Sequence, residues 1–409
     1  MTGGASLDRA RAAALNFALP GDLIEVAAHG TGHINATFVV TMDQAGTHVR
    51  YLLQLLNTHV FREPTLLMDN VVRVTEHLRR RMAADGIRGL SRRTLTVVRS
   101  LDGSPFWRDG GRGEGDGFWR CYLFIEGAHY SDLMDSTHKA FALGAASGRF
   151  LEQVSDLPGP RLAETIPNFH NARTRYAAFE KAVAEDQVGR VASVAREIAF
   201  FRENLEGFDR IVAALASGEA PERITHNDTK ISNLLVDDET GEAICVIDLD
   251  TVMPGSTAYD FGDLVRTVPI STSEDDPEPG RMVLVPEMFA ALSRGFASGT
   301  MVPERAAEPK ADPQAAGRSF LTEREIELLP VGARVITMLM GIRFLTDFLD
   351  GDRYYKVARD SHNLDRCRTQ IALVRSMDSQ ASMMRETTLS AFAALCQDHA
   401  GRASGRDRT

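Results

Sequence analysis

The sequence predicts an α+β protein in which an N-terminal antiparallel sheet with one main helix precedes a mainly helical C-terminal part. Three patterns support this prediction. Short apolar segments typical of strands fill residues 22–56, residues 63–82 carry apolar side chains at helical spacing, and helical periods dominate from Asp132 onward. The 409 residues, 44% hydrophobic and 25% charged, suffice for two or three packed units.

The N-terminal elements follow in order along the chain. "RAAALNFALPGD" predicts a short helix closed by Pro20-Gly21, and two strands around a glycine-containing turn are expected in 23–42, with a third at 48–56. In "EPTLLMDNVVRVTEHLRRRM", Pro64 stands at a helix start. Two more strands are expected in "TLTVVRSLDGSPFWR" and "GFWRCYLFIEG". Residues 1–127 are therefore expected to form one lobe.

The C-terminal elements are helices, such as "THKAFALGAASGRFLEQV", interrupted by one β interlude at 224–248. Within it, "NLLVDDETGEAICVIDLD" predicts a hairpin. The Pro- and Ala-rich segment 302–320 is expected to be a loosely held insertion, and 401–409 a polar tail. We therefore expect a second lobe over 128–400.

Composition excludes several classes of partner. The formal net charge is −10 and Lys and Arg are scattered, so neither nucleic acid nor an anionic membrane is an expected partner. The four cysteines form no C-x-x-C pair, the N-terminus lacks the apolar region of a signal peptide, and the apolar run at 335–342 is too short to span a bilayer. We expect a cytoplasmic protein with a small-molecule substrate; the oligomeric state stays open.

The most specific motif is "ITHNDTKISNLLV" at 224–236, which contains His226, Asp228, Lys230 and Asn233 in the spacing H-x-D-x-K-x-x-N of a kinase catalytic loop. A carboxylate can accept the proton of the attacking hydroxyl, an amide oxygen can hold a metal, and an ammonium can offset phosphoryl charge. The histidine is expected to pack and to fix the loop by hydrogen bonds. These residues predict phosphoryl transfer.

Two groups of aspartates compete to complete a metal site with Asn233. The predicted hairpin returns Asp248 beside Asn233, which favours Asp248 as the ligand. Asp250, on the same face, is either a second acid near the metal or a residue that supports the first. The literal Asp-Phe-Gly of kinases begins at Asp260, but this residue stands at a helix start, where we expect it to cap the helix or support the catalytic loop.

The N-terminal lobe supplies the nucleotide-binding candidates. Gly30 and Gly32, between two strands, would let backbone N–H groups approach phosphates, although this signal alone is weak. The third strand, where kinases place a phosphate-pairing lysine, offers only Arg50 and Gln54. "YLFIEG" at 122–127, which includes Glu126, is the expected adenine-binding hinge.

Four residues are candidates for contacts with the acceptor. His33 and Asn35 in "HGTGHINATFVV" either face a polar substrate or cap the turn. In "GIRFLTDFLDGDRYYKV", Arg343 and Tyr354 lie among apolar residues; the arginine either forms a structural ion pair or contacts the substrate.

The order of these motifs resembles the aminoglycoside phosphotransferase-like kinases, and most closely the N-acetylhexosamine 1-kinases, which transfer the γ-phosphate of ATP to the anomeric hydroxyl of N-acetylglucosamine or N-acetylgalactosamine. "HNDTK" and "RFLTDFLDGDRYYK" carry the resemblance most specifically. It implies a two-lobed protein-kinase-like fold and the cofactors Mg²⁺ and ATP. It also implies that Asp228 is the base and Asn233 and Asp248 are magnesium ligands, with His33, Arg343 and Tyr354 in the sugar pocket.

Two alternatives remain open on sequence grounds. The acceptor could be another small hydroxyl compound, such as a different sugar, an aminoglycoside or a choline-like molecule. The absent third-strand lysine also allows a catalytically silent nucleotide-binding protein. Sugar identity depends on single hydrogen bonds in the pocket, which the sequence does not give.

Overall fold

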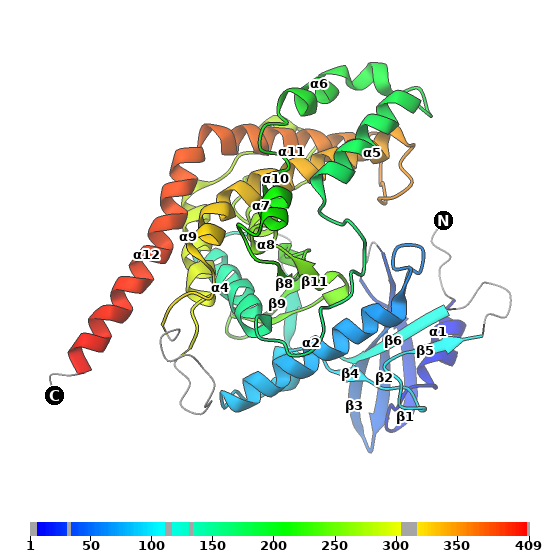
Figure 1. The fold of residues 1–409 in the computed structure, drawn as a ribbon. Helices are drawn as coiled ribbons and strands as arrows, with labels where there is room; N and C mark the ends of the chain where they lie inside the picture. The colour runs from blue at the N-terminus through cyan, green and yellow to red at the C-terminus, as the bar shows by residue number, and fades with distance from the viewer. Residues whose placement is uncertain (1–5, 31–33, 111–116, 131–133, 304–316, 407–409) are drawn as a thin grey trace. The chain divides into compact units, whose positions relative to one another are not determined.

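The computed structural model describes residues 6–30, 34–110, 117–130, 134–303 and 317–406, with side chains of the last helix described as far as residue 395. The chain divides into two compact units. The first comprises Met1–Ala128, Gly159–Pro167 and Ile247–Met253; the second comprises His129–Pro158, Asn168–Val246 and Pro254–Thr409. Figure 1 shows their elements in chain order.

The first unit is built on a six-stranded sheet whose pairs are all antiparallel, in the order β1-β2-β3-β6-β4 with β5 paired to β6. The expected fourth strand over 94–108 is instead two short strands. Between them, the Ser100 hydroxyl donates to the Asp102 carboxylate at 2.6 Å and Gly103 has a positive φ of 87°, which makes a turn. The strands are β1 (Asp22–Ala28), β2 (Ala36–Gln44), β3 (Thr47–Leu55), β4 (Val97–Val98), β5 (Trp107–Asp109) and β6 (Gly117–Leu123).

Helix α1 (Leu7–Ala14), capped by the Ser6 side chain, covers one face of this sheet. Its buried alanines pack with Phe38, Leu53 and Cys121, which point to that face from β2, β3 and β6. Because successive side chains of a strand point to opposite faces, the residues next to these three in sequence line the other face. That opposite face carries Thr37, Gln54 and Arg120, which are also neighbours in the strand register.

Helix α2 (Pro64–Ala84) is followed by α3 (Leu90–Arg93). It binds the two segments of the first unit that come later in the sequence, Gly159–Pro167 and Ile247–Met253. The side-chain amide of Asn70 on α2 donates to the backbone oxygens of Ala163 (2.8 Å) and Val252 (3.0 Å). The second of these segments holds the 3-10 turn η3 (Leu249–Thr251). A buried asparagine therefore holds the 247–253 segment within the N-terminal unit, although it is distant in sequence.

The second unit is mainly helical, and α10 (Glu323–Leu349) runs through its core (Figure 1). Its other helices are α4 (Thr137–Val154), α5 (Ala172–Glu185), α6 (Ala195–Glu203), α7 (Arg210–Ser217), α8 (Thr257–Thr267), α9 (Pro286–Gly299), α11 (His362–Ser379) and α12 (Ala381–Arg406), with 3-10 turns η1 (Val191–Val194), η2 (Ile231–Asn233) and η4 (Pro279–Arg281). Its strands are β7 (Ala128–Tyr130), β8 (Arg223–Thr225), β9 (Leu234–Asp237), β10 (Ala243–Val246) and β11 (Met253–Gly255).

Of the helices in the described ranges, α10 alone is long and apolar enough to cross a membrane, and 72% of its most apolar window is buried inside the structure. It is a core helix. A capping box between Thr322 and Glu325 fixes its start, and its buried face packs with Phe179, Phe201 and Ile371 from neighbouring helices. The α+β class predicted from the sequence is confirmed, as is the β9–β10 hairpin.

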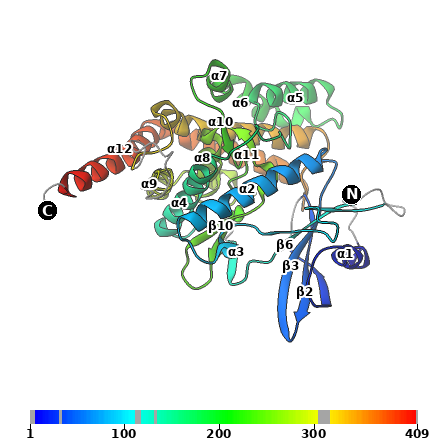
Figure 2. The same ribbon diagram turned by 60° about the horizontal axis from the view of Figure 1, so that its bottom comes forward.

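The C-terminal predictions hold less well. Helix α12 continues to Arg406 and extends away from the other helices in Figures 1 and 2, so much of the predicted polar tail 401–409 is helical. In the predicted insertion 302–320, residues 304–316 lie outside the described residues. Its two ends meet, because the Val302 N–H donates to Arg318 and the Gly317 N–H donates to Val302, both at 2.9 Å.

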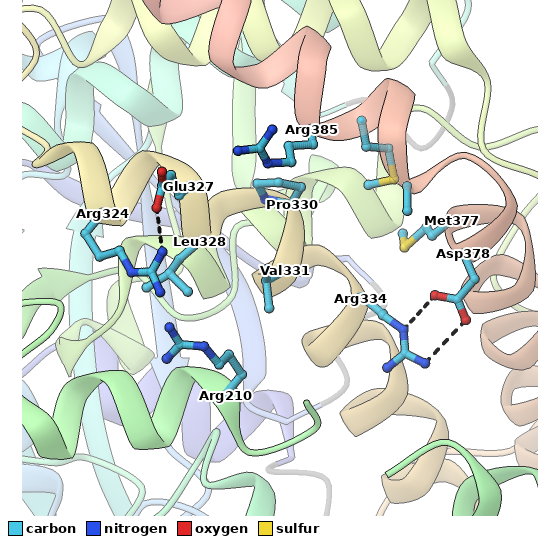
Figure 3. A pocket seen from close by; sticks show the side chains of 12 residues that line it. Arg210, Arg324, Glu327, Leu328, Pro330, Val331, Arg334, Met377, Asp378 and Arg385 are labelled. Carbon is cyan, nitrogen blue, oxygen red and sulfur yellow. Dashed lines mark hydrogen bonds and ion pairs between the residues drawn. The ribbon is translucent and has the colours of Figure 1, made fainter. Parts of the chain in front are cut away.

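A pocket of about 500 Å³ opens among α7, α10, α11 and α12 (Figure 3). No residue that the sequence predicts for the functional site lines it. Two of its arginines, Arg324 and Arg334, pair with Glu327 and Asp378 across its rim. The first pair lies along α10, and the second joins α10 to α11. Neither pair involves a residue of the predicted functional site.

Candidate active site

The loop between β8 and β9 gathers the predicted catalytic residues in one place. The Lys230 ammonium lies 3.0 Å from Oδ2 of Asp228. The side-chain amide of Asn233, in η2, donates to the same Oδ2 at 3.0 Å and to the backbone oxygen of Asp228 at 2.8 Å. Because the nitrogen of a planar amide is committed to Asp228, the Asn233 oxygen points away from that carboxylate and can accept a cation.

Asp228 is ionised at neutral pH. Burial alone would raise its pKa, but the Lys230 ammonium and other nearby positive groups, including Arg266, lower the pKa to about 2. A carboxylate with so low a pKa is a weak base. Such a base suits phosphoryl transfer, in which an aspartate can orient a hydroxyl and receive its proton late, when the phosphoryl group has largely left its donor.

The buried carboxylate of Asp260 supports this loop. Its oxygens accept hydrogen bonds from the backbone N–H groups of His226 and Asn227, both at 2.7 Å. The Thr229 hydroxyl donates to the backbone oxygen of Asp260 at 2.6 Å. Burial raises the pKa of Asp260 to about 6 in spite of these donors.

His226 also fixes the loop, as the sequence predicts. It is fully buried, its ring lies edge-on to that of Phe150, and its Nδ1 accepts the backbone N–H of Asp228 at 3.3 Å. The histidine therefore acts through packing and one local hydrogen bond.

The Asp-Phe-Gly tripeptide of this chain is a structural element. It lies inside α8, whose start is capped by Ser256, so the expected loop-support role of Asp260 is found and a capping role is not. Phe261 is fully buried against Phe296. At Gly262, a Cβ atom would lie only 2.7 Å from the backbone oxygen of Gly332 on α10, so only glycine allows this close approach.

Asn227 (φ 63°), directly before the predicted base, and Asp248 (φ 58°), a predicted metal ligand, adopt left-handed backbone conformations that are uncommon outside glycine. Such strain is often kept at functional positions. The β9–β10 register places Val246 beside Leu234, the residue after Asn233. Asp248 follows two residues later, at the start of η3 in the first unit.

Asp250 is committed to neighbours in the first unit. Its Oδ1 pairs with the Arg120 guanidinium, with both side chains nearly inaccessible, and its Oδ2 accepts the Asn35 amide at 2.8 Å. Of the two roles left open for Asp250, support of its segment is the one that these contacts favour. Asn35 likewise reaches Asp250 and, through its own oxygen, the backbone N–H of Asn57 at 3.0 Å.

The nucleotide-binding candidates all belong to the first unit. Gly30 has φ 69° and open space where a Cβ would stand; Gly32 and His33 lie outside the described residues. Arg50 and Glu126 meet in an exposed ion pair, with the guanidinium 4.2 Å from the Phe124 ring centroid. Gln54, four residues after Arg50 on β3, points to the same face of the sheet and accepts the Arg120 Nε–H there at 2.9 Å.

The acceptor candidates Arg343 and Tyr354 lie together in the second unit. The Arg343 guanidinium lies 5.0 Å from the ring centroid of Phe169, 5.8 Å from Tyr354 and 5.6 Å from Tyr355. Tyr354 is 52% exposed, so one side of this cluster is accessible. We refer to Phe169, Arg343, Tyr354 and Tyr355 as the aromatic cluster.

Three residues near this cluster were not among the predicted site residues. The Nε2–H of His170 donates to the backbone oxygen of Asn227 (2.8 Å) beside Asp228, and Arg175 donates to the Phe169 oxygen at 3.1 Å. Asp347, on α10, accepts the backbone N–H groups of residues 353–355 at 2.7–3.0 Å and so shapes the turn that presents Tyr354 and Tyr355. The "FLDGDRYY" turn chemistry could have signalled the last of these.

Positive charge surrounds His170. Burial is the main cause that lowers its pKa, to about 3, and Arg343 and Arg175 add to the effect. Burial and the neighbouring Arg343 also lower the pKa of Arg175, to about 10. The two guanidinium groups therefore lie close enough to repel each other, near the predicted base.

A half-buried aspartate with a lysine and an amide in kinase spacing is an arrangement that can accept a hydroxyl proton next to a phosphoryl donor. Comparison with known proteins agrees with this reading, because residues 25–284 match the phosphotransferase enzyme family (APH). The chain belongs to the phosphotransferase enzyme family. The predicted enzyme class, a phosphotransferase that acts on an alcohol group, is confirmed, and so is the predicted family.

Solved structures with low sequence identity share the fold of this phosphotransferase. A microcompartment-associated aminopropanol kinase is 15% identical, with a TM-score of 0.52 over 93% of this chain and 99% of that chain. An amicoumacin kinase in complex with AMP-PNP, Ca²⁺ and its substrate is 14% identical, with a TM-score of 0.54 over 90% and 93%. A choline kinase from Cryptosporidium parvum Iowa II is 14% identical, with a TM-score of 0.50 over 91% and 93%. The predicted kinase-like fold is confirmed.

The predicted metal ligands Asn233 and Asp248 carry an amide and a carboxylate oxygen, which are donor types that Mg²⁺ prefers. Among the described residues no group of three or more His, Cys, Asp or Glu side chains could by itself hold a metal ion. Mg²⁺ in kinases is held by one or two protein oxygens together with waters and phosphate oxygens, so a site that uses Asn233 and Asp248 needs no such group.

Proposed function

We propose that this phosphotransferase is a sugar kinase that transfers the γ-phosphate of ATP to the anomeric hydroxyl of an N-acetylhexosamine. The observation that carries the proposal is the aromatic cluster together with His170 and Arg175, which adjoin the loop of Asp228. Aromatic faces provide apolar contact to a sugar ring, and guanidinium N–H groups donate to hydroxyl or amide oxygens. An N-acetyl carbonyl offers a strong acceptor for such donors.

The charge of this region disfavours a cationic acceptor. An aminoglycoside or a choline-like molecule would bring positive charge beside Arg343 and Arg175, which already depress the pKa of His170. A neutral sugar avoids this repulsion. Among the residues that the structure describes, the Arg343 guanidinium lies near three aromatic rings and 3.4 Å from the Met340 sulfur, and it pairs with no carboxylate there.

We assign the remaining roles as follows. Asp228 accepts the proton of the sugar hydroxyl, and Lys230 holds Asp228 ionised and offsets phosphoryl charge. Asn233 and Asp248 would hold Mg²⁺, which would neutralise charge on the phosphates of ATP when bound. The proposed ATP-binding residues remain Gly30, Arg50, Gln54 and Glu126. We also propose that the enzyme works in the cytoplasm.

A coupled assay of ADP release over a panel of free sugars, aminoglycosides and choline, with Mg-ATP, tests this proposal. We expect turnover with N-acetylglucosamine or N-acetylgalactosamine and little with cationic acceptors. Turnover confined to cationic acceptors, or with none of the panel, would refute the sugar assignment. The family membership would stand in either case, because it rests on the match of residues 25–284.

A matched pair of variants ties the assignment to the aromatic cluster. Arg343→Met removes the guanidinium there, and we expect a higher KM for the sugar with nucleotide affinity unchanged. Arg375→Met removes a similar contact, 5.2 Å from the ring centroid of Phe200, elsewhere in the helical unit, and should leave the sugar KM unchanged. Equal effects of the two substitutions would show that Arg343 contributes only to folding.

A further inference from the structure

A polar row crosses the sheet of the first unit on the face opposite α1. The strand register places Thr37 on β2 opposite Gln54 on β3, and Gln54 opposite Arg120 on β6. Hydrogen bonds join the three: the Gln54 amide donates to the Thr37 hydroxyl at 3.1 Å, and the Arg120 Nε donates to the Gln54 oxygen at 2.9 Å. Arginine in the middle of a sheet, with a relative exposure of 2%, is uncommon and calls for a partner.

The partner is Asp250, whose relative exposure is also 2%. The Arg120 guanidinium pairs with its Oδ1, while Asn35, just before β2, donates to its Oδ2. Arg120 also feels the charge of Asp248: burial would lower the pKa of Arg120, but Asp250 and, more weakly, Asp248 hold it above its ordinary value. The row thus ends on the segment that carries the proposed metal ligand.

This arrangement offers an answer to the missing lysine of the third strand. At Gln54 the third strand presents an amide, and a buried cation on this face comes from the neighbouring strand at the paired position. A guanidinium carries its donors in a planar fork, and Arg120 uses one nitrogen on Asp250 and its Nε on Gln54, so it can fix the orientation of its partner better than an ammonium. Asp248 itself holds a strained left-handed conformation, which requires support from its surroundings.

We propose that Arg120 is a positioning residue for the phosphotransfer reaction: by pairing with Asp250 it anchors the 247–253 segment to the sheet and fixes Asp248 for binding a divalent cation. The proposal rests on the assignment of Asp248 as a metal ligand. It places Arg120 behind the metal-binding segment, so Arg120 itself does not contact the phosphates.

The test measures binding of Mn²⁺ by electron paramagnetic resonance in the presence of a non-hydrolysable ATP analogue, alongside thermal unfolding and the Mg²⁺ dependence of kcat. Arg120→Met should weaken Mn²⁺ binding and raise the half-saturating Mg²⁺ concentration at least tenfold. Arg120→Lys, which keeps the charge but loses the fork, should show an intermediate shift. Since Arg120→Met leaves a buried carboxylate unpaired and could unfold, Arg120→Met with Asp250→Asn is measured as well and should show the same loss.

Arg9→Met provides the matched control. Arg9 pairs with Asp109 of the same sheet, with Nε and Oδ2 at 2.6 Å, and both residues lie in the first unit but outside its 247–253 segment. Its loss should lower the melting temperature and leave Mn²⁺ binding unchanged. If the double variant folds and binds Mn²⁺ as tightly as the wild type, Arg120 does not position the metal-binding segment.

Two further comparisons separate the possible failures. If Asp248→Ala binds Mn²⁺ like the wild type, the ligand assignment fails and the proposal falls with it. If Asp248→Ala loses Mn²⁺ and the Arg120 variants do not, only the role of Arg120 is refuted. Nucleotide affinity measured in EDTA should be unchanged in Arg120→Met; a loss as large as that measured with metal would place Arg120 on the phosphates and overturn the positioning role.

Discussion

The Oδ1 of Asp260 accepts the backbone N–H of Asn227 at 2.7 Å, so a helix residue holds the catalytic loop at the position directly before Asp228. Asn227 is in the left-handed region at φ 63°, and this contact, with the parallel bond to His226, stabilises that conformation. The geometry of the predicted base thus depends on Asp260, to which we assign no step of the reaction.

Removal of this support should cost mainly stability. Asp260→Ala leaves two buried N–H groups without their acceptor, and we expect a loss of about 2 kcal/mol or more in the free energy of unfolding. Asp260→Asn keeps one acceptor oxygen and should lose less. Denaturant unfolding of both variants checks this. Full stability of Asp260→Ala would show that the carboxylate does not hold the loop.

Asp248→Ala should behave in the opposite way. Because Asp248 is the proposed metal ligand, its loss should abolish Mg²⁺-dependent activity while the protein remains folded. The assay is turnover over a range of Mg²⁺ concentrations, with circular dichroism as the check on folding. An Asp248→Ala enzyme that keeps the Mg²⁺ response of the wild type would exclude it as a ligand.

Asp228→Asn should remove the proton acceptor and keep the shape of the loop. We expect kcat to fall by about a hundred- to ten-thousand-fold, the usual contribution of a general base, with nucleotide affinity nearly unchanged. Single-turnover kinetics and calorimetric nucleotide titration measure the two quantities. Unchanged product formation would remove Asp228 as the base.

The pH dependence of stability should contain a contribution from His170. Its pKa is lowered to about 3 in the folded protein, chiefly by burial, whereas the unfolded chain binds a proton near the ordinary pKa of 6.5. The unfolded state therefore gains protons first, and folded-state stability falls as the pH drops below about 6.5. Between pH 7.5 and pH 5 the loss should reach up to roughly 2 kcal/mol.

His170→Gln should remove this part of the acid sensitivity, and the exposed His138→Gln serves as the control. Denaturant unfolding at the two pH values gives the difference directly. The folded protein gains stability when Asp260, whose pKa is raised to about 6, takes up a proton in the same pH range. This contribution is the same in the wild type and in both variants. An acid sensitivity of His170→Gln equal to that of the wild type would contradict the buried neutral state of His170.

The sequence predicted those parts of the fold and site that depend on local patterns. The strand and helix periods gave the sheet of the first unit and α2, and motif spacing gave Asp228, Lys230 and Asn233, which the structure brings within hydrogen-bonding distance. It missed the split of the fourth strand, because the side-chain bond between Ser100 and Asp102 that makes the turn is invisible to periodicity.

Contacts between distant residues set the limit of sequence analysis at the site. The pairing of Arg120 with Asp250 joins residues 130 positions apart, and that of His170 with Asn227 joins residues 57 apart. The residues next to each member of such a pair in the sequence do not indicate which distant residue it will contact. From the sequence, Asp250 could be a second acid near the metal or a residue that supports the first, and its pairing with Arg120 favours the second role.

The central claim is phosphorylation of an N-acetylhexosamine at its anomeric oxygen. Phosphorus NMR of the product of a reaction with Mg-ATP and N-acetylglucosamine or N-acetylgalactosamine tests it most directly, because coupling of phosphorus to the anomeric proton identifies the phosphorylated position. We predict a single sugar phosphate with coupling to that proton. A phosphate coupled to any other sugar proton, or no sugar phosphate from either substrate, would contradict the claim.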